Sequence, residues 1–132
     1  MSKLIDRLRT HKVLVADGAT GTMLQRAGLE PGVAPERWNL ENPQAILELH
    51  QGYVNAGSDL ILTNTFGGTS IRLEREGLSD QAAAINQTAA RLAREVAGDA
   101  VLVVGDIGPT GEMLAPLGTL TYEEIVPVFA AQ

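Results

Sequence analysis

The chain has 132 residues, of which 45% are hydrophobic and 4% aromatic, and its formal net charge is −6. This length suits one globular domain with an aliphatic core, and an acidic chain without basic clusters argues against nucleic acid as a partner. No apolar run approaches the roughly 20 residues of a membrane span, and the amphipathic start lacks the core of a secretory signal. Cysteine is absent, which excludes disulfides and thiolate metal ligands. A cytoplasmic location is therefore expected.

The first forty residues predict one helix, one strand and an irregular excursion. Residues 2–9 carry apolar side chains at helical spacing. Residues 13–16 (VLVA) form an apolar run without alternation, which is typical of a parallel strand covered on both faces. A glycine-rich loop leads to a predicted helical turn over 22–26. Two prolines and a glycine predict that 29–42 is irregular, with Trp38 anchoring it to the body of the protein.

The next segment predicts a helix followed by a strand. Asn42 and Pro43 are typical N-cap and first-turn residues, and Gly57 is a typical helix stop. The second strand is predicted at 60–63, and it runs into polar residues and glycines.

The remaining chain repeats the same order of elements. Residues 70–76 predict a short helix, and Ser79 is expected to cap a longer one that ends at Gly98, because apolar residues recur there every three or four positions. A third strand is predicted at 101–104. After a long loop, Thr121 and the glutamate three residues later form the pattern of a capping box.

All three predicted strands end at a polar residue: Asp17, Asn64 or Asp106. Crossovers through helices produce a parallel sheet that the helices cover. An open doubly wound sheet usually carries G-x-G-x-x-G after its first strand, and the first loop here lacks it. In a barrel, every strand delivers its C-terminal end to one mouth. We therefore predict an α/β fold with parallel β/α units of a TIM-type (β/α)8 barrel. About the first three of eight strands would be present in a single partial domain (1–132), since a barrel takes about 250 residues.

Several motifs resemble, in the same order, those of the homocysteine S-methyltransferase family, which includes the barrel domain of methionine synthase and betaine–homocysteine methyltransferase. The first is 17–24 (DGATGTML). The others are Trp38-Asn39, Asn42-Pro43, His50 with Tyr53, 56–59 (AGSD), 63–67 (TNTFG) and 105–112 (GDIGPTGE). They span nearly the whole chain, which is similar to the N-terminal part of such a barrel, and most of all to the cobalamin-dependent methionine synthase branch.

The resemblance implies methyl transfer to the sulfur of homocysteine to give methionine, with zinc binding the thiolate. In the family, cysteines of the sixth and eighth strands bind the metal, and a glutamate beyond the third strand binds the substrate amino group. This chain has no cysteine and does not reach those strands. No residue here is therefore predicted as a metal ligand or a catalytic group, and the chain alone is expected to be inactive. The methyl donor stays open among methylcobalamin on a corrinoid protein, methyltetrahydrofolate, betaine and S-methylmethionine.

The resemblance implies that this chain forms the floor and one wall of a homocysteine pocket. Backbone N–H groups of Gly18 and Ala19 can bind the substrate carboxylate, with Asp17 as an acceptor beside them. The other predicted substrate contacts are Thr20, Asn64, Thr65 and Asp106.

Each candidate also has a purely structural interpretation. The 18–22 loop can be a tight turn, Asp17 and Asp106 can be caps or loop staples, and Asn64 can be a buried structural amide.

Side chains near the motifs are expected to have ordinary roles. His11 is expected to be solvated, and His50, on an apolar helix face, to be a satisfied and partly buried histidine rather than a ligand. The charged side chains expected on a solvated surface are Arg72, Arg75, Glu76 and Glu112.

Two other classes of function remain open at this point. The chain can be a self-contained α/β module that binds an anion or an amino acid. It can also be a non-catalytic partner that completes a barrel with another chain, in cis or in trans. Three strands would leave two open sheet edges, which favours self-association.

Overall fold

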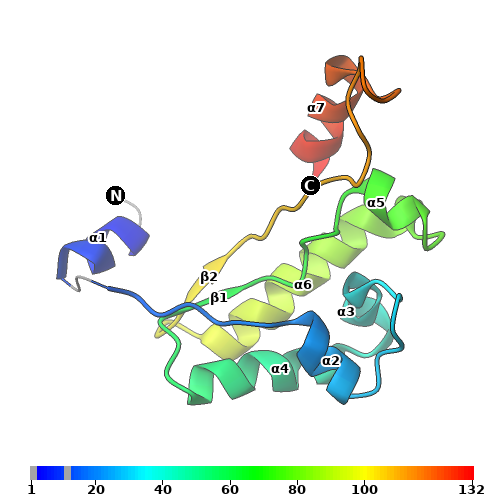
Figure 1. Ribbon diagram of the computed structural model, residues 1–132. Coiled ribbons are helices and arrows are strands. Elements are labelled where there is room, and N and C mark those ends of the chain that lie inside the picture. The colour runs from blue at the N-terminus through cyan, green and yellow to red at the C-terminus, as the bar shows by residue number, and fades with distance from the viewer. Residues whose placement is uncertain (1–2, 11–12) are drawn as a thin grey trace.

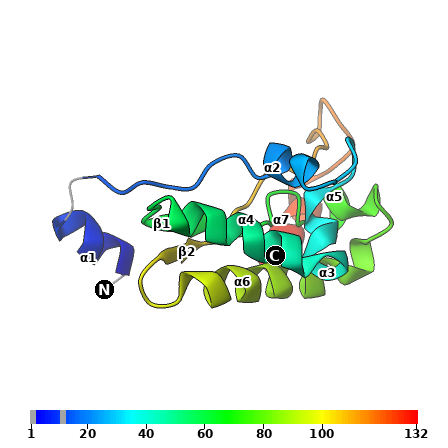
Figure 2. The same cartoon turned by 90° about the horizontal axis from the view of Figure 1, so that it is seen from below.

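The computed structural model describes residues 3–10 and 13–132, so the prediction for His11 lies outside the described residues. Two short parallel strands lie at the centre, and the two longest helices run side by side against one face of them (Figures 1 and 2). The helices and 3-10 turns are α1 (Lys3–Thr10), α2 (Gly21–Arg26), η1 (Pro35–Arg37), α3 (Trp38–Glu41), α4 (Pro43–Asn55), α5 (Ser70–Glu74), η2 (Ser79–Gln81), α6 (Ala82–Ala97) and α7 (Tyr122–Ala131). Within the described ranges, none of these helices is long and apolar enough to cross a membrane.

The sheet consists of β1 (Leu60–Leu62) and β2 (Leu102–Val104). They pair in parallel, with Leu60 opposite Leu102 and Leu62 opposite Val104. The parallel direction follows from the crossover through α6, which returns the chain to the same end of the sheet. The second and third predicted strands are therefore confirmed, each one residue shorter than expected.

The first predicted strand is wrong in the described structure. Residues 13–16 form only an isolated parallel bridge, between Ala16 and Leu60. The side chains of Val13 and Val15 are 75% and 56% exposed. The segment therefore does not have other elements packed on both of its faces, as was expected of a buried parallel strand. The segment lies beside β1, but no strand of the described chain pairs with its other edge. The described part of the chain thus contains two strands rather than three.

The irregular excursion is more ordered than its prolines predict. Between residues 29 and 42 the chain forms the 3-10 turn η1 and the short helix α3. Pro35 stands at the start of η1, where its fixed φ and missing N–H are tolerated. Trp38 packs against the core, as expected for an anchor.

Two of the predicted helix caps make no cap hydrogen bond. Asn42 precedes α4, and Pro43 occupies the first turn as expected, but φ −142° and ψ 62° at Asn42 are not the extended conformation of an N-cap. Ser79 does not cap α6, because it begins the 3-10 turn η2 that precedes that helix.

The predicted capping box is confirmed. The hydroxyl of Thr121 accepts from the backbone N–H of Glu124, and the Glu124 carboxylate accepts from the backbone N–H of Thr121 at 2.8 Å. A cap that was not predicted is Thr69, whose hydroxyl accepts from the Arg72 N–H at the start of α5.

The core is aliphatic, as the composition predicts. α6 contributes to three buried clusters because its apolar residues recur every three or four positions. The clusters are Leu24, Leu29, Ile46, Leu49 and Leu92; Ile61, Ala93, Ala97 and Val101; and Leu73, Leu78 and Ile85. They hold both strands on the helical layer and so direct the C-terminal ends of β1 and β2 toward α5 and the excursion.

His50 is buried more completely than expected. It lies in α4 with only 2% exposure, and neither ring nitrogen has a hydrogen-bond partner in the described residues. The expectation of a satisfied, partly buried histidine is therefore wrong. Burial lowers the pKa of His50 to about 4, because a buried imidazolium loses its hydration.

Candidate functional site

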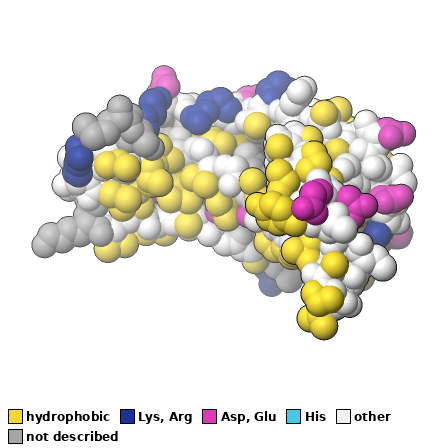
Figure 3. Space-filling model, turned by 90° about the horizontal axis from the view of Figure 1, so that it is seen from above, with side chains coloured by type: hydrophobic (Ala, Val, Ile, Leu, Met, Phe, Trp, Pro, Cys, Tyr) yellow, Lys and Arg dark blue, Asp and Glu magenta, His cyan; other side chains and the backbone are white. Residues whose placement is uncertain are grey.

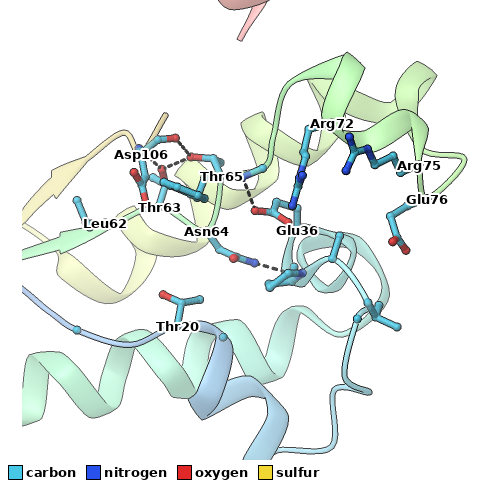
Figure 4. A pocket seen from close by; sticks show the side chains of 18 residues that line it. Thr20, Glu36, Leu62, Thr63, Asn64, Thr65, Arg72, Arg75, Glu76 and Asp106 are labelled. Atoms are coloured by element: carbon cyan, nitrogen blue, oxygen red, sulfur yellow. Dashed lines mark hydrogen bonds between the residues drawn. The ribbon is translucent and has the colours of Figure 1, made fainter. Parts of the chain in front are cut away.

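A cavity of about 580 Å³ opens where the two strands end (Figure 4). Several segments that are distant in sequence meet there because both parallel strands deliver their C-terminal ends to one side. Its walls come from the glycine turn after residue 17, the excursion at 32–36, the end of β1 with its loop, Arg72 of α5 with two residues that follow this helix, and Asp106.

Five of the seven predicted substrate contacts line this cavity: Gly18, Thr20, Asn64, Thr65 and Asp106. Asp17 and Ala19 are not among the lining residues. One Asp17 carboxylate oxygen, Oδ2, accepts from the backbone N–H of Leu62 at 2.9 Å, so the side chain is tied to β1. The Ala19 carbonyl accepts from the Tyr53 hydroxyl at 2.9 Å.

The glycine turn lies close beneath Tyr53 of α4. A Cβ on Gly18 would come within 3.3 Å of the Tyr53 hydroxyl, so the absence of a side chain permits this approach. The backbone N–H groups of Gly18 and Ala19 donate no hydrogen bond within the described residues. They are therefore available to an anionic ligand group.

Asp17 and Asp106 form an acidic pair near the end of β1. Burial raises the pKa of Asp17, and the nearby charge of Asp106 raises it further, while the Leu62 N–H acts in the opposite direction. Burial also raises the pKa of Asp106. The other carboxylate oxygen of Asp17, Oδ1, is buried and has no partner in the described structure. A cationic group at this position would relieve both the repulsion and the missing hydrogen bond.

Thr65 belongs to a closed hydrogen-bond network with Thr63 and Asp106. Its hydroxyl donates to the Asp106 carbonyl at 2.7 Å, and it lies 2.6 Å from the Thr63 hydroxyl. The Thr63 hydroxyl in turn accepts from the Asp106 N–H at 3.1 Å. The Thr65 proton is therefore already used to hold the loop after β2 against the loop after β1.

Asn64 has the geometry of a structural amide. It is 5% exposed, and its side-chain NH₂ donates to the Pro35 backbone carbonyl and to the Asn39 side-chain oxygen Oδ1, each at 2.9 Å. Both amide hydrogens are used, so this group joins the excursion to β1. Substrate contact through these hydrogens would require both bonds to break.

Glu36 is a cavity residue that the sequence analysis missed. It is 4% exposed, and its Oε1 atom accepts from the Gly67 N–H at 2.6 Å. A Cβ on Gly67 would come within 3.0 Å of that carboxylate. Glutamate in a proline-rich excursion gives no sequence signal of burial, because tertiary contacts alone bring it to the loop after β1.

Arg72 and Arg75 are exposed, as predicted for a charged surface. Together with Glu76 they also line the cavity, which the sequence analysis did not predict. Arg75 donates to Glu112 at 2.6 Å and to the Gly111 carbonyl at 3.2 Å, so Glu112 is an ion-pair partner rather than only a solvated charge.

The residues present do not fit a zinc–thiolate site. The chain contains no cysteine, and no three His, Asp or Glu side chains in the described ranges are grouped as metal ligands. Zinc coordinated by protein needs three or four such groups.

The family model described as homocysteine S-methyltransferase matches residues 14–132. The chain belongs to the homocysteine S-methyltransferase family. Betaine–homocysteine S-methyltransferase 1 from Danio rerio is 34% identical over 134 residues, which cover 98% of this chain and 32% of that protein. The family resemblance drawn from the motifs is therefore confirmed.

Solved structures of the family show the same arrangement. The metallated form of the homocysteine methyltransferase MmuM from Escherichia coli aligns with a TM-score of 0.73 at 28% identity, over 82% of this chain and 42% of that chain. Its oxidized form aligns with a TM-score of 0.73 at 27% identity, over 84% of this chain and 42% of that chain. The chain thus spans less than half the length of these homocysteine S-methyltransferases.

Proposed function

We propose that this chain is the N-terminal part of a zinc-dependent homocysteine S-methyltransferase with a TIM-type barrel, acting in methionine formation in the cytoplasm. The observation that carries the proposal is the cavity at the C-terminal ends of two parallel strands, where Gly18 and Thr20 meet the 63–67 loop. Both segments belong to the motifs shared with the family. Membership in the family and the aligned MmuM structures support the reaction type.

In this proposal the inner end of the cavity binds the amino-acid part of homocysteine. The free N–H groups of Gly18 and Ala19 bind the carboxylate. Asp106, which lines the cavity, accepts a hydrogen bond from the ammonium group, and the nearby carboxylate of Asp17 adds negative charge behind it. Asn64 and Thr65 then act mainly by holding the loops that form this end.

The zinc expected from the family would hold and activate the substrate thiolate when bound. The described residues offer no ligand set for it, so the ligands would come from outside this segment. We therefore expect binding of substrate without turnover by these 132 residues. Measured methylation of homocysteine by the chain alone would contradict this expectation.

Substitution of Asp17 tests the proposed orientation of the substrate. Asp17→Asn retains an acceptor for the Leu62 N–H but removes the negative charge. We expect homocysteine binding to weaken about tenfold, because the attraction between opposite charges about 4 Å apart contributes about 1–4 kcal/mol near a protein surface. Isothermal titration calorimetry with L-homocysteine measures both the affinity and the stoichiometry.

The matched control is Asp80→Asn, which removes an equal charge from the exposed turn η2, outside the cavity. It should bind homocysteine like the unaltered chain. Absence of homocysteine binding by the unaltered chain, or equal binding by Asp17→Asn, would contradict the proposed site.

A self-contained binding module is a second candidate, and one observation favours it. The N–H groups of Gly18 and Ala19, which donate no hydrogen bond within the described residues, lie in one turn and can bind an anion without donors from another segment. Calorimetric titrations with phosphate and with L-homocysteine distinguish the two candidates. Phosphate binding with a defined stoichiometry, together with no homocysteine binding, favours a general anion-binding module.

A further inference from the structure

The glycine turn at Gly18 and Ala19 is held by one side chain, that of Tyr53 in α4. Both residues of the turn are exposed, so packing does not fix their orientation. Their only hydrogen bond to the rest of the described chain is the one that the Tyr53 hydroxyl donates to the Ala19 carbonyl at 2.9 Å. The neighbouring positions are tied elsewhere, Asp17 to β1 and Thr20 to the first turn of α2. The orientation of the turn therefore depends on this hydroxyl.

Tyr53 is itself well fixed. It is half-buried and packs against two clusters of the core, one that contains Leu24 and one that contains Ile61. The turn lies directly on its ring, because a Cβ on Gly18 would come within 3.3 Å of the hydroxyl and 3.6 Å of the ring atom Cε1. An ordered ring loses little conformational freedom when its hydroxyl makes a hydrogen bond. Tyr53 thus connects the packed helix α4 to an exposed turn.

The same hydrogen bond sets the direction of a further N–H group, that of Thr20. The peptide between Ala19 and Thr20 is trans, so its carbonyl and its N–H point in opposite directions. Because the carbonyl points to Tyr53, the Thr20 N–H points away from α4, and Figure 4 shows Thr20 on the side of that helix where Asn64 lies. Thr20 lines the cavity, and its N–H donates to none of the described residues. This N–H is therefore available to the same ligand as those of Gly18 and Ala19.

Order in the turn before the ligand arrives decides how well such N–H groups bind. Successive backbone N–H groups in a turn can form a concave site for an anion. A loop that becomes ordered only on binding loses affinity, because its conformational freedom is then lost at that step. A turn that is already held in one orientation avoids this loss. Among the described residues, Tyr53 is the one whose side chain holds it.

We propose that Tyr53 is a positioning residue of the carboxylate site. Its hydroxyl holds the Ala19 carbonyl, so that the free N–H groups of residues 18–20 bind a carboxylate together. Tyr53 is not among the residues that line the cavity, and it acts through the turn rather than by contact with the ligand. It thereby sets the preference of the cavity for ligands that carry a carboxylate. This inference rests on the proposed function, in which the turn binds the carboxylate of homocysteine.

Three probes separate an effect on carboxylate binding from a general effect on the cavity. Acetate is a carboxylate alone, L-homocysteine carries a carboxylate, and 3-aminopropane-1-thiol is homocysteine without it. Tyr53→Phe removes the hydroxyl and keeps the ring that packs in the core. It should weaken the binding of acetate and of L-homocysteine about fivefold, the effect of losing one ordinary hydrogen bond. The affinity for 3-aminopropane-1-thiol should not change.

Nuclear magnetic resonance of the whole isotope-labelled chain measures both the position of binding and the affinity. Acetate should shift the backbone amide resonances of Gly18, Ala19 and Thr20, and the dependence of these shifts on acetate concentration gives the Kd. The same method tests the hydrogen bond without any ligand. In Tyr53→Phe the carbonyl carbon resonance of Ala19 should move upfield, because this carbonyl no longer accepts from the hydroxyl.

Tyr122→Phe is the matched control. It removes the same hydroxyl from the other tyrosine of the chain, which is 71% exposed and begins α7 outside the cavity. This variant should bind all three probes like the unaltered chain and should leave the Ala19 carbonyl resonance in place. A difference between the two variants therefore belongs to the position of the hydroxyl and not to the loss of a tyrosine.

Three results would overturn the inference: no acetate-induced shift at any of the three amides, equal acetate affinity of Tyr53→Phe and Tyr122→Phe, or an equal loss of affinity for L-homocysteine and 3-aminopropane-1-thiol in Tyr53→Phe. Homocysteine binding that Tyr53→Phe leaves unchanged overturns only the role of Tyr53. Acetate binding that depends on Tyr53, without homocysteine binding, overturns only the proposed function.

Discussion

His50 illustrates at the residue scale how tertiary burial changes a side chain that looks unremarkable in the sequence. It occupies the apolar face of α4 with both ring nitrogens unpartnered. Protonation in the folded state would bury an unpaired charge, which explains the pKa of about 4. The unfolded chain has no such restriction, and its histidine titrates near 6.5.

This difference predicts an acid-sensitive fold. As the pH falls from 6.5 to 4, the unfolded state takes up the proton first, so stability is complete above 6.5 and decreases toward 4. The loss is on the order of 3 kcal/mol at about 1.4 kcal/mol per pKa unit. Urea unfolding at each pH measures it. His50→Leu should be less pH-dependent over this window; an identical pH profile for variant and unaltered chain would refute the effect.

The candidate site shows the same limit of residue-scale prediction. Asp17 and Asp106 could be named from the sequence because polar residues at the ends of successive parallel strands gather at one edge of a sheet. Glu36 could not, because only the packing of the excursion brings it to Gly67. Arg72 looked like surface, because the cavity beside α5 exists only in the folded chain.

At the scale of elements, α7 is held by its ends rather than by burial. None of its residues is buried. Its N-terminus has the capping box, and beyond its C-terminus the Gln132 side chain donates to the Thr65 carbonyl at 2.8 Å and to Asn86 at 3.3 Å. Its position beside the loop after β1 therefore depends on a few polar contacts.

Removal of the Thr121 hydroxyl should loosen α7 selectively. Thr121→Ala loses the cap at a cost of about 1 kcal/mol, so the amides of α7 should exchange with deuterium about fivefold faster while those of α6 change little. Hydrogen-exchange mass spectrometry measures this difference. Thr119→Ala, in the exposed loop just before, is the control and should have no effect. Unchanged exchange in α7 would show that the cap does not limit its stability.

At the scale of the whole molecule, the fold leaves much apolar surface uncovered. Hydrophobic side chains gather over a large part of the face shown in Figure 3. Exposed examples come from both ends of the chain: Ile5, Leu8, Val13, Val15, Met113, Leu117 and Tyr122. Such surface marks an interface in most proteins. The rest of a barrel, in cis or in trans, would cover the side of the sheet that lacks helices.

We expect this chain by itself to associate through that surface. Size-exclusion chromatography with light scattering should give a mass above 14.0 kDa that rises with concentration. Val15→Lys places a charge on the exposed residues 13–16 and should shift the distribution of oligomeric states toward the monomer. Gln87→Lys, on the exposed face of α6, adds the same charge elsewhere and should not. A monomer at every concentration would contradict the expectation.

The sequence by itself determined the family, the order of the elements and the glycine and polar segments at the ends of the strands. These features are local: helical periodicity, apolar runs, the Thr121 capping box and contiguous motifs such as 63–67 can be read without knowing distant partners. Tertiary structure alone decided whether residues 13–16 pair as a strand, whether Asn64 is free, and that Glu36 and Arg72 share a cavity. Each of those outcomes depends on contacts between distant segments, and composition and spacing do not specify such contacts.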